Sequence, residues 1–262
     1  MLKWETMAPM PRHQGLGTLI VTGASRGIGA AIARMAGARG FSVAVNFAKS
    51  EAEAQAVAKE ISSARGCASA IQADIACEED VLRLFDRAER ELGPLKALVN
   101  NAAITGGFSR VEAVTAKTLT DVMAINVTGA ILCAREAVRR MSTMHGGTGG
   151  AIVNISSRAA KIGSAGEWVH YAASKGAIDT FTLGLAREVA AEGIRVNAVA
   201  PGHIETGLHA ASGDPDRLSR VSSAIPMQRP GSPNEIAEAV LWLLSPAASY
   251  TTGAILDVGG GR

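Results

Sequence analysis

A chain of 262 residues with a formal net charge of only +2 lacks the excess charge of a nucleic-acid or anionic-membrane surface, so we expect small-molecule partners. Hydrophobic residues make up 47% of the sequence and aromatic residues only 4%, which favours a core of Ala, Val, Ile and Leu. Three cysteines without a Cys-x-x-Cys pair fit a disulfide framework poorly and favour a cytoplasmic location.

The first half of the chain alternates apolar strands with helical segments. Residues 1–17 contain no apolar run of the kind found in signal peptides or membrane spans, and we expect a disordered extension or a misassigned start. Beyond them, the pattern predicts strands at 18–22, 41–47, 68–73 and 97–100, and helices at 30–39, 50–64 and 78–92. Such alternation implies a parallel sheet covered by helices on both faces.

The second half continues the alternation until an irregular segment interrupts it. We expect helices at 128–143, 169–191 and 234–244, and strands at 151–155, 195–199 and 254–258. Residues 202–233 are rich in Gly, Ser, Pro and His, with one short helix expected near 216–223, and a loop of that length is usually functional. We interpret it as a substrate lid, with His203, Glu205, His209 and Met227 as candidate lining residues. Seven strands without a linker predict a single doubly wound Rossmann-type α/β domain over residues 18–262.

A glycine-rich turn follows the first strand. Residues 22–29 read Thr-Gly-Ala-Ser-Arg-Gly-Ile-Gly, where backbone N–H groups at the start of a helix could receive a pyrophosphate. The spacing differs from the usual Gly-x-Gly-x-x-Gly fingerprint, and a turn without a ligand is the alternative. We predict that this turn contributes Gly23, Ser25, Arg26, Gly27, Ile28 and Gly29 to a dinucleotide site.

The end of the second strand bears on the choice of cofactor. An acidic residue there would bind the ribose 2′-hydroxyl of NAD, but residues 46–50 read Asn-Phe-Ala-Lys-Ser. A guanidinium suits a 2′-phosphate, so we predict NADP(H), with Arg26 and Lys49 as charge partners and Asn46 beside them. The alternative is that Arg26 simply lies in solvent.

Tyr171 and Lys175 are four residues apart on an expected helix, so both point to one face about 6 Å apart along the axis. A nearby cation lowers the pKa of a phenol from its ordinary value near 10, which would make Tyr171 a usable acid and base. A plain surface contact between the two side chains is the alternative.

Polar residues also follow two central strands. Ser156 and Ser157 end the strand at 151–155, and we favour Ser157 over its neighbour as the donor to a substrate oxygen. Asn100 and Asn101 end the strand at 97–100, and Asn126 is expected just before a helix. Isolated Asn residues are usually caps or turns, but together these groups indicate a site.

In combination, these motifs resemble the short-chain dehydrogenase/reductase family, in the style of bacterial 3-oxoacyl-carrier-protein reductases and sugar 1-dehydrogenases. The similarity runs from about residue 19 to residue 260. It rests on Thr-Gly-x-x-x-Gly-x-Gly at 22–29, Asp74, Asn-Asn-Ala at 100–102, Asn126, Ser157, Tyr-x-x-x-Lys at 171–175 and Pro-Gly at 201–202. Two departures are Ala103, where the family often has glycine, and a Ser157 to Tyr171 spacing one residue longer than in many members.

The resemblance implies a role for each matching residue. Asn126, Ser157, Tyr171 and Lys175 would be catalytic, with Asn126 supporting a water-mediated proton relay through Lys175. Lys175 would also hold the nicotinamide ribose, Asp74 the adenine edge, and Ile204 with Thr206 the carboxamide. The remaining cofactor contacts would come from Ile75, Asn100, Ala102, Tyr171, Pro201 and Gly202.

The expected function is a hydride transfer between NADP(H) and a ketone, sugar or 3-oxoacyl thioester. An acyl-carrier substrate would favour Arg139 and Arg140 near the mouth of the site. The loop histidines lack a Cys or carboxylate cluster, so we expect no metal. The family implies a homotetramer, and Ala134, Ala137, Ala173 and Ala177 could pack between subunits or within one. The rival interpretation is a nucleotide-binding regulatory or scaffold protein without catalysis.

Overall fold

The structure is a computed structural model that describes residues 15–206 and 222–262. Three expectations fall wholly or mostly outside these ranges: the extension at residues 1–14, the short helix near 216–223, and the position of His209. Part of the expected lid, residues 207–221, lies outside them as well.

Seven strands form one parallel sheet in the order β3-β2-β1-β4-β5-β6-β7. The expected doubly wound α/β fold is therefore confirmed. After β3 the chain crosses back over the sheet, so that β4 lies beside β1 on the side opposite to β2. The strands are β1 (Thr18–Val21), β2 (Ser42–Phe47), β3 (Cys67–Gln72), β4 (Leu95–Asn100), β5 (Gly150–Ile155), β6 (Ile194–Pro201) and β7 (Ile255–Val258).

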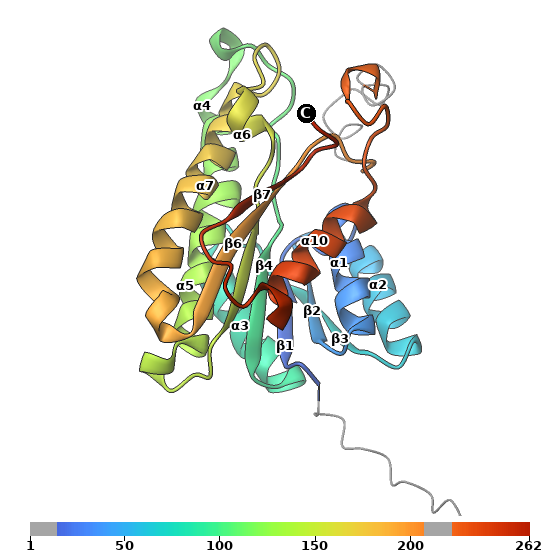
Figure 1. Ribbon diagram of the computed structural model, residues 1–262, viewed down its shortest axis with the longest axis vertical. Coiled ribbons are helices and arrows are strands. Elements are labelled where there is room, and N and C mark those ends of the chain that lie inside the picture. The colour runs from blue at the N-terminus through green and yellow to red at the C-terminus, as the bar shows by residue number, and fades with distance from the viewer. Residues whose placement is uncertain (1–14, 207–221) are drawn as a thin grey trace, which may run out of the picture.

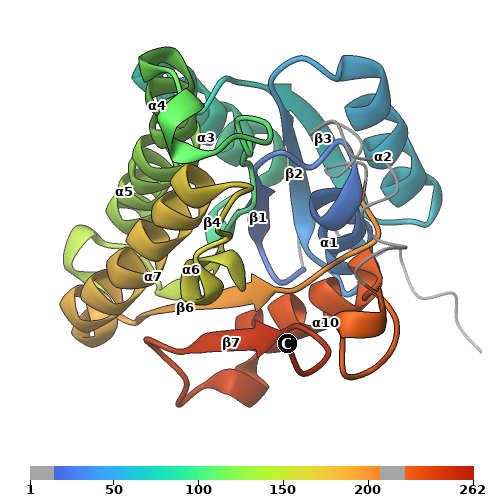
Figure 2. The same ribbon diagram turned by 90° about the horizontal axis from the view of Figure 1, so that it is seen from above.

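Helices cover both faces of the sheet, with α1, α2 and α10 on one face and α3, α5 and α7 on the other (Figures 1 and 2). None of the helices within the described ranges is long and apolar enough to cross a membrane. The long helices are α1 (Gly27–Ala38), α2 (Glu51–Ser63), α3 (Glu78–Leu92), α4 (Ala116–Met123), α5 (Ala130–Met141), α7 (Val169–Val189) and α10 (Pro233–Leu244). Shorter ones are η1 (Val111–Ala113), η3 (Thr143–His145), α6 (Ala159–Ile162), η4 (Ala190–Glu192), η5 (Ser222–Ala224) and η6 (Pro246–Ala248).

The strand residues divide between two apolar cores, one on each face. Leu19 and Val21 of β1 pack with α1, α2 and α10, whereas Ile20 packs with α3 and α5, and all three are fully buried. This division follows from the two-residue repeat of a strand. Because both faces are covered, the central strands are mainly apolar, and the carboxyl ends of the parallel strands share one edge of the sheet.

The helical region before β5 corrects one expectation. The sequence predicted a helix from residue 128, but the chain is already helical in α4 and continues through a π-helical segment, η2 (Ala124–Gly129), into α5. Asn126 therefore lies inside the helical run, where a position just before a helix was expected. α4 is only eight residues long and buries only Val122, so it offers sequence analysis a short pattern to detect.

Candidate active site

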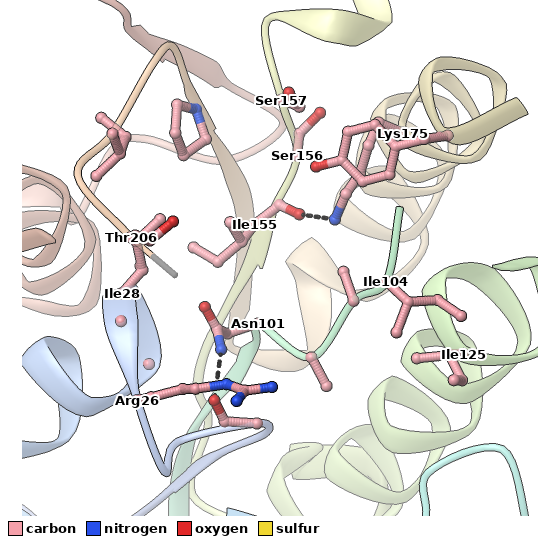
Figure 3. Close-up of a pocket in the computed structure, with 18 of the residues that line it drawn as sticks. Arg26, Ile28, Asn101, Ile104, Ile125, Ile155, Ser156, Ser157, Lys175 and Thr206 are labelled. Carbon is pink, nitrogen blue, oxygen red and sulfur yellow. Dashed lines mark hydrogen bonds between the residues drawn. The ribbon is translucent and has the colours of Figure 1, made fainter. Parts of the chain in front are cut away.

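A cavity of about 520 Å³ opens at the carboxyl ends of the strands, a volume typical of small-molecule sites. Segments that follow β1 through β6 all contribute to its lining. Figure 3 shows the cavity with Arg26 in one part of it and Ser157 and Lys175 in another. The predicted residues that line it are Gly23, Ser25, Arg26, Gly27, Ile28, Gly29, Asn46, Lys49, Asp74, Ile75, Ala102, Ser157, Tyr171, Lys175, Pro201, Gly202, His203, Ile204 and Thr206.

The glycine-rich turn forms a cradle that larger residues would fill. Gly23 and Gly27 have φ angles of +61° and +56°, which favour glycine. A Cβ atom on Gly23 would lie 2.9 Å from the Cα of Ala102, and one on Gly29 would lie 2.5 Å from the carbonyl oxygen of Gly23. Among the described residues, no side chain caps the start of α1 and no acidic residue occupies its first turn. The helix start can therefore receive an anion.

Basic side chains predominate in the lining of this cavity. Arg26 and Lys49 are both exposed to it, consistent with the expected contacts to a phosphate. Asn46 also lines the cavity, but its amide is occupied: its Oδ1 accepts from the Gly23 N–H at 3.2 Å and its Nδ2 donates to the Ala73 carbonyl at 3.1 Å. Asn46 thus shapes the turn. Among the described lining residues, the charged side chains are those of Arg26, Lys49, Arg158, Lys175 and Arg262, against one acidic side chain, that of Asp74.

The two asparagines after β4 point in different directions. Asn101 lines the cavity, and its Nδ2 donates to the carbonyl oxygens of Thr22 and Gly23 at 2.8 and 3.0 Å. Asn100, which was predicted to contact the cofactor, is outside the lining. Its Nδ2 instead donates to the carbonyl of Ala130 and to Oδ1 of Asn154, each at 3.0 Å, in the protein interior. The described structure therefore assigns Asn101 to the cavity surface and Asn100 to the core.

Tyr171 and Lys175 lie on α7 and are almost completely buried, with 8% and 3% of their surface exposed. The alternative of a plain surface contact is therefore wrong. Lys175 Nζ lies 5.7 Å from the centroid of the Tyr171 ring and donates a hydrogen bond to the Ile155 carbonyl at 2.6 Å (Figure 3). Ser157 follows β5 in the same cavity.

The pKa of Tyr171 differs from the sequence expectation. Burial raises it to about 12, and a hydrogen bond with Ser157 opposes this rise only in part. We had expected Lys175 to lower it, but the sequence could not reveal how deeply the phenol is buried. Burial also lowers the pKa of Lys175 to about 8, against the opposing charge of Asp179.

Asn126 connects the wall of the cavity to α7. Its Oδ1 accepts from the Ile104 N–H at 2.8 Å, and its Nδ2 donates to the Ser174 hydroxyl at 3.0 Å. Ser174 in turn donates to the Tyr171 carbonyl at 2.7 Å. Asn126 itself is outside the lining, although its neighbour Ile125 contributes to it.

Several lining residues were absent from the sequence-based prediction. Trp168 packs between Phe108, with ring centroids 4.6 Å apart, and Tyr171, with centroids 6.1 Å apart. Ile162 also lines the cavity and presents an exposed apolar surface. An aromatic residue three positions before Tyr171, in a chain with few aromatics, was the one available signal. The others are Phe47, Ala48, Ser50, Ala73, Ile104, Ile125, Ile155, Arg158, Ala159, Ser164 and Arg262. Asn101, Ala103 and Ser156, which the sequence placed at the strand ends beside the expected site, also line the cavity.

Other candidates from the sequence lie away from this cavity. Met227 lines a smaller pocket of about 80 Å³ together with His203, and Glu205 lines neither pocket. Arg139 and Arg140 form ion pairs with the buried Glu136 at the end of α5, outside the cavity mouth. Residues 15–206 and 222–262 contain no group of three or more His, Cys, Asp or Glu residues that could hold a metal ion.

Comparisons with known proteins give one consistent result. A family model described as "Enoyl-(Acyl carrier protein) reductase" matches residues 23–262. The chain is 52% identical over 243 residues to the "Uncharacterized oxidoreductase YgfF" of Escherichia coli (strain K12), covering 93% of this chain and 98% of that protein.

Two solved structures are also similar over nearly their whole lengths. One is a blue fluorescent protein from a metagenomic library in complex with NADPH, with a TM-score of 0.86 and 35% identity, covering 95% of this chain and 98% of that one. The other is a 3-ketoacyl-(acyl-carrier-protein) reductase from Brucella melitensis complexed with NADH, with a TM-score of 0.87 and 33% identity, covering 94% and 98%.

Proposed function

This chain belongs to the short-chain dehydrogenase/reductase family, and we propose that it is an NADP(H)-dependent oxidoreductase acting on a carbonyl or secondary alcohol. The observation that carries the proposal is the convergence of Ser157, Tyr171 and Lys175 in the cavity that the glycine-rich turn also lines. Tyr171 acts as the general acid and base. The substrate is a ketone, a sugar or a 3-oxoacyl thioester.

The residues present fit a nicotinamide dinucleotide. The glycine cradle and the uncapped start of α1 suit the pyrophosphate, and Asp74, which lines the same cavity, would contact the adenine edge. Two exposed cations, Arg26 and Lys49, support a 2′-phosphate and hence NADP(H). One similar structure holds NADPH and another NADH, so the preference rests on these two side chains.

The nicotinamide supplies the hydride for reduction or accepts it for oxidation. In the reductive direction, Ser157 donates a hydrogen bond to the substrate oxygen, and Tyr171 donates its proton to the same oxygen. Such donors stabilise the developing negative charge by about 3 kcal/mol each. Lys175 binds the nicotinamide ribose, while Ile204 and Thr206 contact the carboxamide.

Further assignments remain proposals with their own support. A homotetramer is supported by the exposed apolar residues Ile131 on α5 and Leu183 on α7, two helices of one outer layer. Ala134 and Ala137, which were candidates for such an interface, pack inside the subunit.

The free state of all three cysteines supports a cytoplasmic location. We also propose one domain over residues 18–262, with a substrate lid near 202–233.

The proposal is tested with purified protein and a panel of ketones, sugars and 3-oxoacyl thioesters. We expect NADPH absorbance to fall with at least one of these compounds, and NADH to be used less efficiently. NADPH binding without turnover on any compound would instead favour a regulatory nucleotide-binding protein. Failure to bind either cofactor would contradict the proposal entirely.

A further inference from the structure

Asp179 lies on the same face of α7 as Tyr171 and Lys175, because the three residues follow one another at intervals of four. Its Oδ1 accepts a hydrogen bond from the Ser156 hydroxyl at 2.5 Å. Ser156 is 2% exposed and is the direct neighbour of Ser157. The carboxylate therefore connects the helix that carries Tyr171 to the strand end that carries Ser157.

Lys175 has few groups around it that could stabilise its charge. Its Nζ donates to the neutral carbonyl of Ile155, and its side chain is almost completely buried. Burial disfavours the charged form of an amine, and among the described residues Asp179 supplies the carboxylate whose charge opposes that effect. A buried lysine of this kind depends on a nearby anion to keep its proton.

The charges around Asp179 come from three elements. Lys175 belongs to the same helix, Lys161 approaches from α6, and Asp257 approaches from β7. Lys161 Nζ is itself 2.8 Å from Asp257 Oδ2, and Arg158 also forms an ion pair with Asp257. Since Asp257 is already engaged by these two cations, Asp179 remains the carboxylate for the Ser156 hydroxyl and for Lys175.

We propose that Asp179 is a positioning residue of the reaction, which holds Ser156 through its hydrogen bond and retains the proton of Lys175 through its charge. This inference rests on the proposed function, in which Lys175 binds the cofactor ribose. Asp179 touches neither substrate nor cofactor and acts through these two neighbours.

Two substitutions separate the hydrogen bond from the charge. Asp179→Asn removes the charge but keeps a side-chain oxygen that can accept from Ser156. Ser156→Ala removes the hydrogen bond but keeps the charge. If the charge of Asp179 keeps Lys175 protonated, Asp179→Asn should change the pH at which Lys175 loses its proton, and Ser156→Ala should not.

The measurement is NADPH binding to the full chain, followed by fluorescence from about pH 7 to pH 10, the range that includes the deprotonation of a buried lysine. We expect the wild type to lose affinity as pH rises through about 8. In Asp179→Asn the midpoint should move to lower pH, because the variant lacks the carboxylate charge that opposes the effect of burial on Lys175. Ser156→Ala should keep the wild-type midpoint.

Controls distinguish this effect from general damage. Asp179→Glu restores the charge and should return the midpoint toward that of the wild type. Asp121→Asn removes an exposed carboxylate on α4 that pairs with Lys117, and should leave the midpoint unchanged. If Asp179→Asn does not fold, as judged by circular dichroism, the Glu and Gln variants at this position make the same comparison.

The possible results separate the inference from the proposed function. An unchanged midpoint in folded Asp179→Asn, or a wild type whose affinity does not vary with pH, would overturn the inference while leaving the oxidoreductase proposal intact. Wild-type protein that binds no NADPH at any pH would overturn the proposed function itself.

Discussion

The side-chain amide of Asn100 donates a hydrogen bond to Oδ1 of Asn154, 3.0 Å away, across the neighbouring strands β4 and β5. Nδ2 of Asn154 in turn donates a hydrogen bond to the hydroxyl of Thr182 on α7, at 2.9 Å. All three side chains are buried. These two hydrogen bonds join the sheet to α7, the helix that carries Tyr171.

Asn100→Ala should therefore weaken folding more than cofactor binding. The substitution leaves the buried Asn154 Oδ1 without the donor that Asn100 supplies, which costs about 1 to 3 kcal/mol of unfolding free energy. Urea unfolding measures this loss, with Gln55→Ala on the exposed face of α2 as the control. Normal stability together with weakened NADPH binding would place Asn100 on the cofactor surface after all.

Gly29→Ala should damage the glycine cradle. Its added Cβ would lie 2.5 Å from both the Gly23 carbonyl oxygen and Asn101 Nδ2, so the turn must shift away from its present position. We expect the affinity for NADPH to fall at least about tenfold, which corresponds to about 1.4 kcal/mol. Gly184→Ala is the matched control, because a Cβ there meets no atom of the described chain within 4 Å. At this exposed position inside α7, alanine should increase the free energy of unfolding by up to about 1 kcal/mol. Equal binding by both variants would argue against the cradle.

The sequence predicted those features of the site that depend on local periodicity. Tyr171 and Lys175 share a face because any helix brings residues four apart together. The glycine-rich turn lies at the cavity because a parallel sheet brings all its strand ends to one edge. Neither inference required knowledge of how the helices pack.

The sequence could not predict features that depend on strand register or on the burial of side chains. Side chains alternate along a strand, so an uncertainty of one residue at the end of β4 exchanges Asn100 for Asn101. The raised pKa of Tyr171 depends on how completely the phenol is buried in the folded protein, which the spacing of residues along the chain does not reveal. The same holds for Ile162, which lies in a short helix without detectable periodicity.

Arg26→Ala should shift the cofactor preference from NADPH toward NADH. A charge-assisted hydrogen bond to a phosphate contributes about 1.5 to 3 kcal/mol, so kcat/KM with NADPH should fall about tenfold or more. The value with NADH should change little, because that cofactor lacks the 2′-phosphate. Steady-state kinetics with both cofactors measure the ratio, and Lys59→Ala, an exposed cation on α2, serves as the control. A parallel loss with both cofactors would instead indicate general damage to the turn.

Cys133 should be unreactive in the folded protein. It is fully buried in the core between α5 and the sheet, and burial raises the pKa of its thiol to about 12. Cys67, by contrast, is exposed. A thiol-disulfide reagent should modify the exposed Cys67 and the half-buried Cys77 in the native protein and Cys133 only after unfolding, and replacing both Cys67 and Cys77 by Ser should remove all native-state modification. Rapid modification of Cys133 in the native protein would contradict the packing of α5 on the sheet.

The two tyrosines of the chain provide a direct test of the proposed acid. Tyr171→Phe keeps the ring that packs beside Trp168 and removes the hydroxyl that bonds to Ser157. Because the pKa of Tyr171 is raised to about 12, the phenol carries its proton at neutral pH and can donate it during reduction. Its loss should reduce turnover by about 10² to 10⁴, the contribution of a positioned acid.

Tyr250→Phe makes the same chemical change at a fully exposed position and should leave turnover at the wild-type level. Single-turnover oxidation of NADPH with an active carbonyl measures the chemical step, and fluorescence measures NADPH affinity separately. A loss of turnover in Tyr171→Phe with unchanged affinity means that the hydroxyl acts in proton transfer, because a structural defect in the cavity would weaken binding as well. Near-normal turnover of Tyr171→Phe would exclude this tyrosine as the acid and require another proton donor in the cavity.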